Sequence, residues 1–232
     1  GGDVVLPLLK KFFYESLCPN DDDHHTESDW ERQFCHENDC QKAAKIKKEA
    51  FSQDPGECVS LKELYEESDG IIHGSITITH SDLSCITCEG VQDVQGCIEI
   101  SNNEKLRVIG CESLTSIEGS LIIRNNPRLS SLDVENVNDL GGIGLYVVAN
   151  RITSISIPDL IYTNTIHIAS NFDLKYVNFD SLHHTLQHLH FNTNPSLAEI
   201  SLPSLEAIGV GYGDGGDLHL QGNTAMKRYS FP

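Results

Sequence analysis

Short alternating apolar segments recur through the last two-thirds of the chain. Each has an apolar residue, any residue and a second apolar residue, and the clearest lie in LIIRNNPRLSSL at 121–132 and LHFNTNPSLAEI at 189–200. A period of two predicts a short strand with one face turned inward, and its recurrence at a near-constant interval predicts a stack of coils. The predicted inward pairs are Ile76 and Ile78, Ile98 and Ile100, Leu121 and Ile123, Leu145 and Val147, Ile166 and Ile168, Leu189 and Phe191, and Leu218 and Leu220.

An asparagine follows the alternating triplet at a fixed offset in six of the predicted coils. The steps between these asparagines are 23, 24, 21, 23 and 29 residues. Side-chain amides bond readily to backbone at turns, so stacked coils should place them above one another in a ladder with a structural role. A degenerate first unit at 76–86 lacks the asparagine, which brings the expected number of coils to about seven. The ladder residues are Asn103, Asn126, Asn150, Asn171, Asn194 and Asn223.

The repeat is absent from the start of the chain. Residues 28–50 have helical composition, and residues 59–68 predict a second short helix. We therefore expect a mainly β solenoid over 71–232 and a small, disulfide-tied, mainly helical cap over 1–70. Such a cap would cover the first coil, whose apolar face has no neighbour on one side.

Eight cysteines lie at or before position 111. An even count gathered at one end predicts four disulfides and an oxidising compartment, and the spacing does not choose among the 105 possible pairings. Structural zinc at Cys85-x-x-Cys88 is the alternative, without a second knuckle of that spacing. The cysteines are Cys18, Cys35, Cys40, Cys58, Cys85, Cys88, Cys97 and Cys111.

The composition is acidic, with 34 acidic and 16 basic side chains and a formal net charge of −18. Nucleic-acid binding needs a basic footprint, so we do not expect it. A solvated acidic surface explains the excess, and calcium binding is the sharper interpretation. No cofactor is indicated, and no apolar run reaches the ~18 residues of a membrane span.

The outward strand positions form a column that ends in three histidines. His167, His190 and His219 should stack in adjacent coils, and His188 lies on the same face one step earlier in its coil. Imidazoles placed in this way could bind a metal or change charge between pH 5 and 8, and a polar sheet face is the alternative. The expected column is Thr77, Glu99, Ile122, Tyr146, His167, His190 and His219.

Catalysis is not expected from this pattern. The outward charged residues Glu99, Arg124 and Asp217 should lie well apart along the stack, without an aligned carboxylate pair. The sequence also lacks the G-x-S-x-G, H-E-x-x-H and phosphate-loop motifs. A polysaccharide-acting β-helix enzyme is therefore only a distant alternative.

The sequence stops inside the seventh predicted coil, which would leave apolar residues and unpaired backbone at that end. We expect either that the natural protein continues or that another protein chain covers this end. A copy stacked head to tail would make a contact that can propagate as a filament. A ligand-binding ectodomain fragment is the alternative. The candidate assembly residues are Val4, Val5 and Leu6 at the start and Met226, Tyr229 and Phe231 at the end.

The repeat (L/I)-x-I-x-x-N-x-x-L-x-x-(L/I) resembles the receptor L domain over roughly residues 71–232. Glycine and serine precede the strand in two units, as in Gly74-Ser75-Ile76 and Gly119-Ser120-Leu121. The family occurs in insulin and epidermal growth factor receptor ectodomains and in fungal and protist surface proteins. The resemblance implies a leucine-rich-repeat-like right-handed β-helix in a secreted or cell-surface protein that recognises other proteins without catalysis. It carries over no ligand residues.

Overall fold

The computed structural model describes residues 58–65, 67–210 and 216–231. The expected helix at 28–50, the cysteines Cys18, Cys35 and Cys40, and the expected docking segment Val4–Leu6 lie outside these residues. What the sequence predicts for them stays a prediction.

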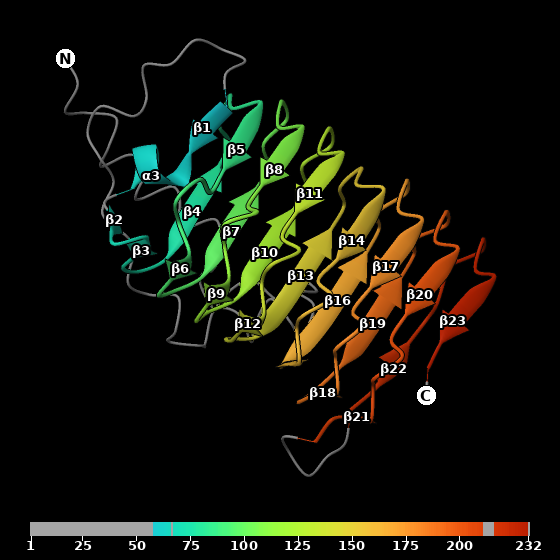
Figure 1. Ribbon diagram of the computed structural model, residues 1–232. Helices are drawn as coiled ribbons and strands as arrows, with labels where there is room; N and C mark the ends of the chain where they lie inside the picture. The colour runs from blue at the N-terminus through green and yellow to red at the C-terminus, as the bar shows by residue number, and fades with distance from the viewer. Residues whose placement is uncertain (1–57, 66, 211–215, 232) are drawn as a thin grey trace, which may run out of the picture. The chain divides into compact units, whose positions relative to one another are not determined.

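The described chain is a parallel β-solenoid, which confirms the expected fold class (Figure 1). One face is a seven-stranded sheet to which each coil contributes one strand. Its pairings are parallel and in register, so Leu121 lies between Ile98 and Leu145. The strands are β4 (Ile76–Thr79), β7 (Ile98–Ser101), β10 (Leu121–Arg124), β13 (Gly144–Val148), β16 (Thr165–Ala169), β19 (Leu189–Asn192) and β22 (Leu218–His219).

Shorter strands form the other two faces, and all their described pairings are parallel except the hairpin of β2 with β3. The second face contains β1 (Cys58–Ser60), β5 (Cys85–Thr87), β8 (Val108–Gly110) and β11 (Ser131–Asp133), then β14 (Ser154–Ser156), β17 (Tyr176–Asn178), β20 (Glu199–Ser201) and β23 (Arg228–Ser230). The third contains β2 (Glu67–Ser68), β3 (Ile71–Ile72), β6 (Asp93–Val94), β9 (Ser116–Ile117) and β12 (Asp139–Leu140), then β15 (Tyr162–Thr163), β18 (His184–Thr185) and β21 (Ala207–Ile208).

A single hydrophobic core runs along the axis of the stack. The inward strand pairs of the first six coils are buried, and so are the leucines that follow the asparagines, such as Leu106 and Leu129. Each coil therefore buries its apolar side against the coils above and below, as expected for a solenoid. In the seventh coil Leu218 is 40% exposed and Leu220 is only partly buried.

The helix expected at 59–68 is present only as a single turn at its centre. The segment forms strand β1, a single helical turn α3 (Leu61–Leu64) and strand β2. Val59 pairs with Ile86 of β5, and this pairing holds the start of the segment extended. Ser60 then caps the turn by accepting from Lys62 N, while the Glu63 side chain accepts from Ser60 N. The described part of the stack thus begins at Cys58, inside the segment assigned to the cap, and the division at residue 70 stays a prediction.

Disulfides join neighbouring coils at the N-terminal end of the stack. Cys58 pairs with Cys85 and Cys88 with Cys111, and Cys97 is also disulfide-bonded. Because Cys85 and Cys88 belong to two different disulfides, the zinc-knuckle alternative is wrong for this pair. The described residues contain no free cysteine.

Candidate functional site

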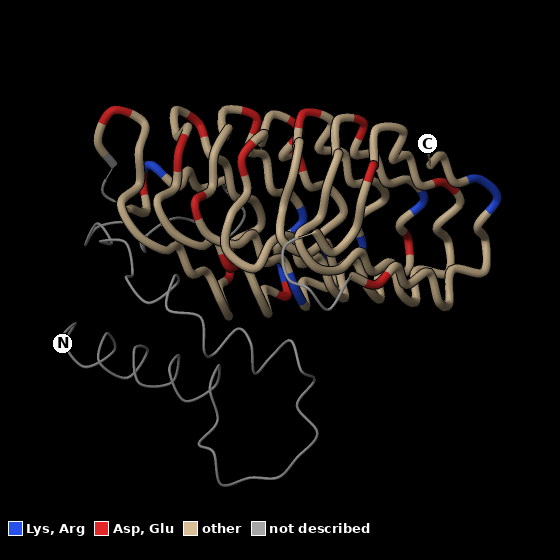
Figure 2. Tube along the Cα trace, turned by 90° about the horizontal axis from the view of Figure 1, so that it is seen from below, with Lys and Arg blue, Asp and Glu red and all other residues tan. Residues whose placement is uncertain are grey.

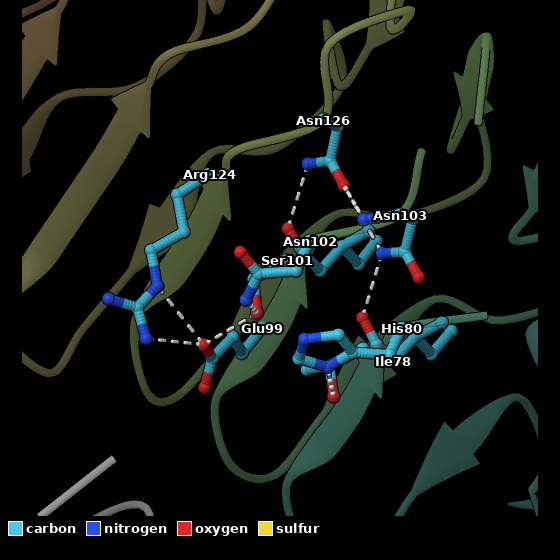
Figure 3. A network of polar contacts seen from close by, with 10 residues as sticks. Ile78, His80, Glu99, Ser101, Asn102, Asn103, Arg124 and Asn126 are labelled. Atoms are coloured by element: carbon cyan, nitrogen blue, oxygen red, sulfur yellow. Dashed lines mark hydrogen bonds and ion pairs between the residues drawn. The ribbon is translucent and has the colours of Figure 1, made fainter. Parts of the chain in front are cut away.

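The six asparagines form a continuous ladder inside the stack and are between 0% and 8% exposed. From Asn103 to Asn194, each backbone N–H donates to the Oδ1 of the next asparagine over 3.0–3.1 Å. Each Nδ2 also donates to a strand carbonyl of the preceding coil, as Asn103 does to Ile78 and Asn126 to Ile100 (Figure 3). The amides therefore satisfy backbone groups that would otherwise be buried without partners. The ladder is therefore structural, because these hydrogen bonds occupy the asparagine side chains.

Each hydrogen-bonded residue of the ladder is called a rung here. The turn before each rung has a feature that the repeat pattern did not reveal. The residue preceding each rung has a left-handed backbone, a conformation that is costly for residues with a Cβ. The first rung is Ser81, whose N–H and hydroxyl both donate to Asn103 Oδ1 at 2.9 and 2.7 Å. The left-handed residues and their φ angles are His80 (51°), Asn102 (56°), Asn125 (54°), Ala149 (56°), Ser170 (57°), Thr193 (55°) and Gly222 (77°).

The outward column has the expected register across the seven-stranded sheet, from Thr77 to His219. Its exposure, however, is graded along the stack. Glu99, Ile122 and Tyr146 are only 3%, 2% and 5% exposed, although none belongs to the central hydrophobic core. The column is partly accessible at Thr77, His167 and His190 and is exposed at His219.

Glu99 and Arg124 are in contact, which corrects the expectation that the charged outward residues lie well apart. Glu99 Oε1 accepts from Arg124 Nη2 at 3.0 Å, from Arg124 Nε at 3.3 Å and from the Ser101 hydroxyl at 3.0 Å (Figure 3). In the pairing of β10 with β7, Arg124 lies opposite Ser101, which is two residues after Glu99 on the same strand. Arg124 is therefore on the same face as Glu99. A buried carboxylate bonded in this way is a structural ion pair.

The four histidines of the column come together as a ring cluster. His190 stacks on His219 with centroids 4.4 Å apart and on His188 at 5.2 Å, while His167 meets it edge-on at 5.7 Å. His188 Nδ1 accepts from Asp217 N at 3.3 Å. As the rings lie, the described residues contain no group of three or more His, Cys, Asp or Glu side chains arranged around a common metal position.

Burial lowers the pKa of two of these imidazoles, those of His167 and His190. Burial, and then His219, His167 and His188, lower the pKa of His190 to about 4, and Asp217 partly opposes this. Burial also lowers the pKa of His167. Neutral imidazole is the form that accepts hydrogen bonds and binds metals.

The C-terminal candidates lie on the last described coil. Tyr229 occupies an inward column in which Ile155, Val177 and Ile200 are at most 2% exposed, yet Tyr229 itself is 66% exposed. Its ring lies 5.6 Å from that of Phe231. Met226 and Phe231 are partly buried against the core. The side chains of this coil that occupy inward positions thus have no described coil beyond them to cover them.

Acidic residues recur from coil to coil along the solenoid (Figure 2). The Lys105–Asp82 and Arg151–Asp173 pairs, at 2.7 and 3.0 Å, join neighbouring coils at exposed positions. Exposed pairs of this kind add little stability. The acidic groups therefore form a distributed surface, and calcium binding stays a hypothesis.

Comparison with known proteins shows a family similarity for part of the solenoid. The receptor L domain family model matches residues 70–172, which run from the first coil to the turn after β16. Searches of curated proteins and of solved structures found no significant match. Among the described residues, no helix has the length and apolar character needed to cross a membrane. Residues 70–172 are thus similar to the receptor L domain, and the parallel solenoid is consistent with that fold.

Proposed function

We propose that this chain is a non-catalytic interaction module of an extracellular or cell-surface protein, and that it binds a protein partner. The receptor L domain match on a parallel solenoid carries the proposal, because domains of this family bind without catalysing a reaction. The disulfides Cys58–Cys85 and Cys88–Cys111 support an oxidising, extracellular setting.

The solenoid offers exposed aromatic and aliphatic side chains at two places on neighbouring coils. Phe172 and Tyr176 are both 53% exposed around the turn into β17, and Ile161 and Tyr162 are 50% and 55% exposed at the start of β15. Aromatic side chains are enriched in the buried centres of protein interfaces. These two pairs are therefore the first surfaces to test for a partner.

The test is binding of the purified, fluorescently labelled chain to intact cells of its source. We expect saturable binding that unlabelled protein competes away. Phe172→Ala/Tyr176→Ala and Ile161→Ala/Tyr162→Ala serve as matched double variants, and loss of binding in one alone locates the interface. Absence of competed binding, or free thiols in place of the two described disulfides in protein from the source, would contradict the proposal.

A second candidate function is end-to-end assembly, which the exposure of Tyr229 favours. The edge strands β22 and β23 each have one described neighbour, β19 and β20. Edge strands are templates for pairing with another chain. The ladder also has a direction, because each earlier asparagine donates its backbone N–H onward, and Asn223 is the next donor in that order. A second copy stacked head to tail would make a heterologous contact that can extend into a filament.

Sedimentation velocity over a concentration series tests this assembly. We expect the mean mass of the unaltered chain to rise with concentration, and Tyr229→Asp to remain monomeric. Tyr162→Asp is the matched control, because Tyr162 is also exposed but lies outside the end coil, and it should assemble normally. A monodisperse monomer at every concentration would remove the assembly proposal and leave the binding proposal intact.

A further inference from the structure

Four side chains of types that commonly bind metals form a two-by-two grid on the outward face of two neighbouring coils. They are His188, His190, Asp217 and His219. His188 and His190 are two residues apart, so they share a face and are separated by ~6.6 Å along the strand. His190 lies opposite His219 in the parallel pairing of β19 with β22, and strands in a sheet are ~4.8 Å apart. The same register puts His188 opposite Asp217, and Leu189 N donates to Asp217 O at 2.9 Å.

His190 is central to this grid and has an unsatisfied atom. Its Nε2 is buried, and no hydrogen-bond partner for it exists within the described part of the chain. Buried polar atoms without a partner are rare in native structures and call for an explanation, such as an ion that belongs there. Its two stacking neighbours, His188 and His219, are themselves potential ligands.

We propose that His188, His190 and His219 bind a divalent transition metal of the zinc, copper or nickel class, with Asp217 as the adjacent carboxylate. Imidazole suits these metals, and three imidazoles complete the protein ligand set of zinc in known enzymes. The site lies away from the two aromatic surfaces described above; His219 belongs to the edge strand β22, but all four side chains of the site come from one chain. His167 lies opposite His190 on the preceding coil, meets it edge-on and is not part of the grid.

Binding requires the rings to turn, since they now stack rather than converge. The movement is small, because it involves side-chain torsions and no change in strand register. The His188 side chain is 38% exposed, that of Asp217 is 67% exposed, and His219 is exposed, so these three side chains can rotate toward His190 through solvent. Rotamer changes of exposed side chains take picoseconds to nanoseconds. The chain's net charge of −18 also favours the approach of a cation.

The experiment is a titration of the intact, disulfide-bonded chain with zinc chloride by calorimetry, together with cobalt(II) absorption spectra. We expect one bound ion per chain and visible cobalt bands of a nitrogen-ligated, low-coordinate ion. His190→Gln and His219→Gln should each weaken zinc binding more than about tenfold. His219 is on an edge strand, so its variant keeps the test valid if His190→Gln unfolds.

The matched control is His184→Gln. His184 is also half-exposed and has a carboxylate neighbour, with its Nε2 3.7 Å from Glu206, but it lies on β18 of another face. It should bind zinc like the unaltered chain. No measurable binding would overturn the proposal, and so would an equal loss in His184→Gln and His190→Gln, which indicates general association with surface histidines.

Discussion

The two ends of the described solenoid differ in how far they bury the same kind of apolar side chain. At the N-terminal end, Leu61, Leu64 and Tyr65 of the helical turn are at most 4% exposed and pack into the core. At the C-terminal end, Leu218 and Tyr229 are 40% and 66% exposed, although the residues that they pair with in the preceding coil, Leu189 and Ile200, are fully buried. The stability that an inward residue contributes in a solenoid thus depends on the neighbouring coil that covers it.

Cross-links reinforce this difference. Both disulfides with two described partners join coils at the N-terminal end. There the Tyr65 hydroxyl also donates to Thr77 O at 3.1 Å. The last coil is held chiefly by strand pairing and by the Asn194–Asn223 rung. Local stability should therefore fall from the start of the stack to its end.

The largest expected effect comes from removing a middle rung of the ladder. In Asn150→Ala, Asn126 N loses its acceptor and Ile123 O loses its donor, both inside the stack. Each buried unsatisfied group costs about 1–3 kcal/mol, so we expect a loss of roughly 4 kcal/mol in unfolding free energy. Asn223→Ala, at the more exposed end, should cost roughly half as much. Urea unfolding measures both, and equal losses would contradict the difference between interior and end.

Removing the Cys88–Cys111 disulfide should have the next largest effect. It closes a sequence separation of 23 residues, and a loop of that size corresponds to about 3 kcal/mol of stabilisation. Cys88→Ala/Cys111→Ala should therefore lower the unfolding free energy by about that amount. The loss should appear first as faster hydrogen exchange in the first two coils. If the last coil loosened instead, the N-terminal end would not be independently reinforced.

Alkaline pH should weaken the N-terminal end through Tyr65. Burial raises its pKa to about 12, while the bond to Thr77 opposes the rise. The unfolded chain releases this proton near its ordinary pKa of 10, so the contribution is complete below pH 10 and is lost as pH rises through 12. The two-unit difference corresponds to roughly 3 kcal/mol. Tyr65→Phe should flatten the stability profile between pH 10 and 12, and an unchanged slope would show that another group titrates there.

The smallest expected effect is a gain in stability. Thr193 has a β-branched side chain at a φ of 55°, a conformation that glycine adopts without strain. Thr193→Gly should therefore raise the unfolding free energy by roughly 0.5–1 kcal/mol. Thr153→Gly is the control, because Thr153 has no positive φ and should lose stability. A loss in both variants would mean that the turn carries no strain at this residue.

The sequence predicted the solenoid well because alternation and a fixed asparagine offset are local signals. It identified the inward pairs and the order of the outward column, and both depend only on register. It missed the serine rung at Ser81, since a hydroxyl replaces the amide there. It also missed the left-handed residue before each rung, because six residue types occupy that position.

Other features depended on partners from neighbouring coils and could not be read locally. The helix expected at 59–68 is limited to Leu61–Leu64, and its first residues form a strand because Val59 pairs with Ile86. Glu99 meets Arg124 from the next coil, 25 residues away, so its burial as an ion pair was not visible in its own segment. The stacking of the histidine rings likewise depends on side-chain torsions that the register does not fix.

Native-state hydrogen exchange, resolved coil by coil, tests the central claim most directly. We predict that the backbone N–H groups of Asn126 and Asn150 exchange only on global unfolding, while those of residues 216–231 exchange through local opening. The opening free energy of that last coil should be lower by at least roughly 1.4 kcal/mol, seen as about tenfold faster exchange. Uniform protection from the first coil to the last would contradict a stack whose stability is the sum of its neighbouring contacts.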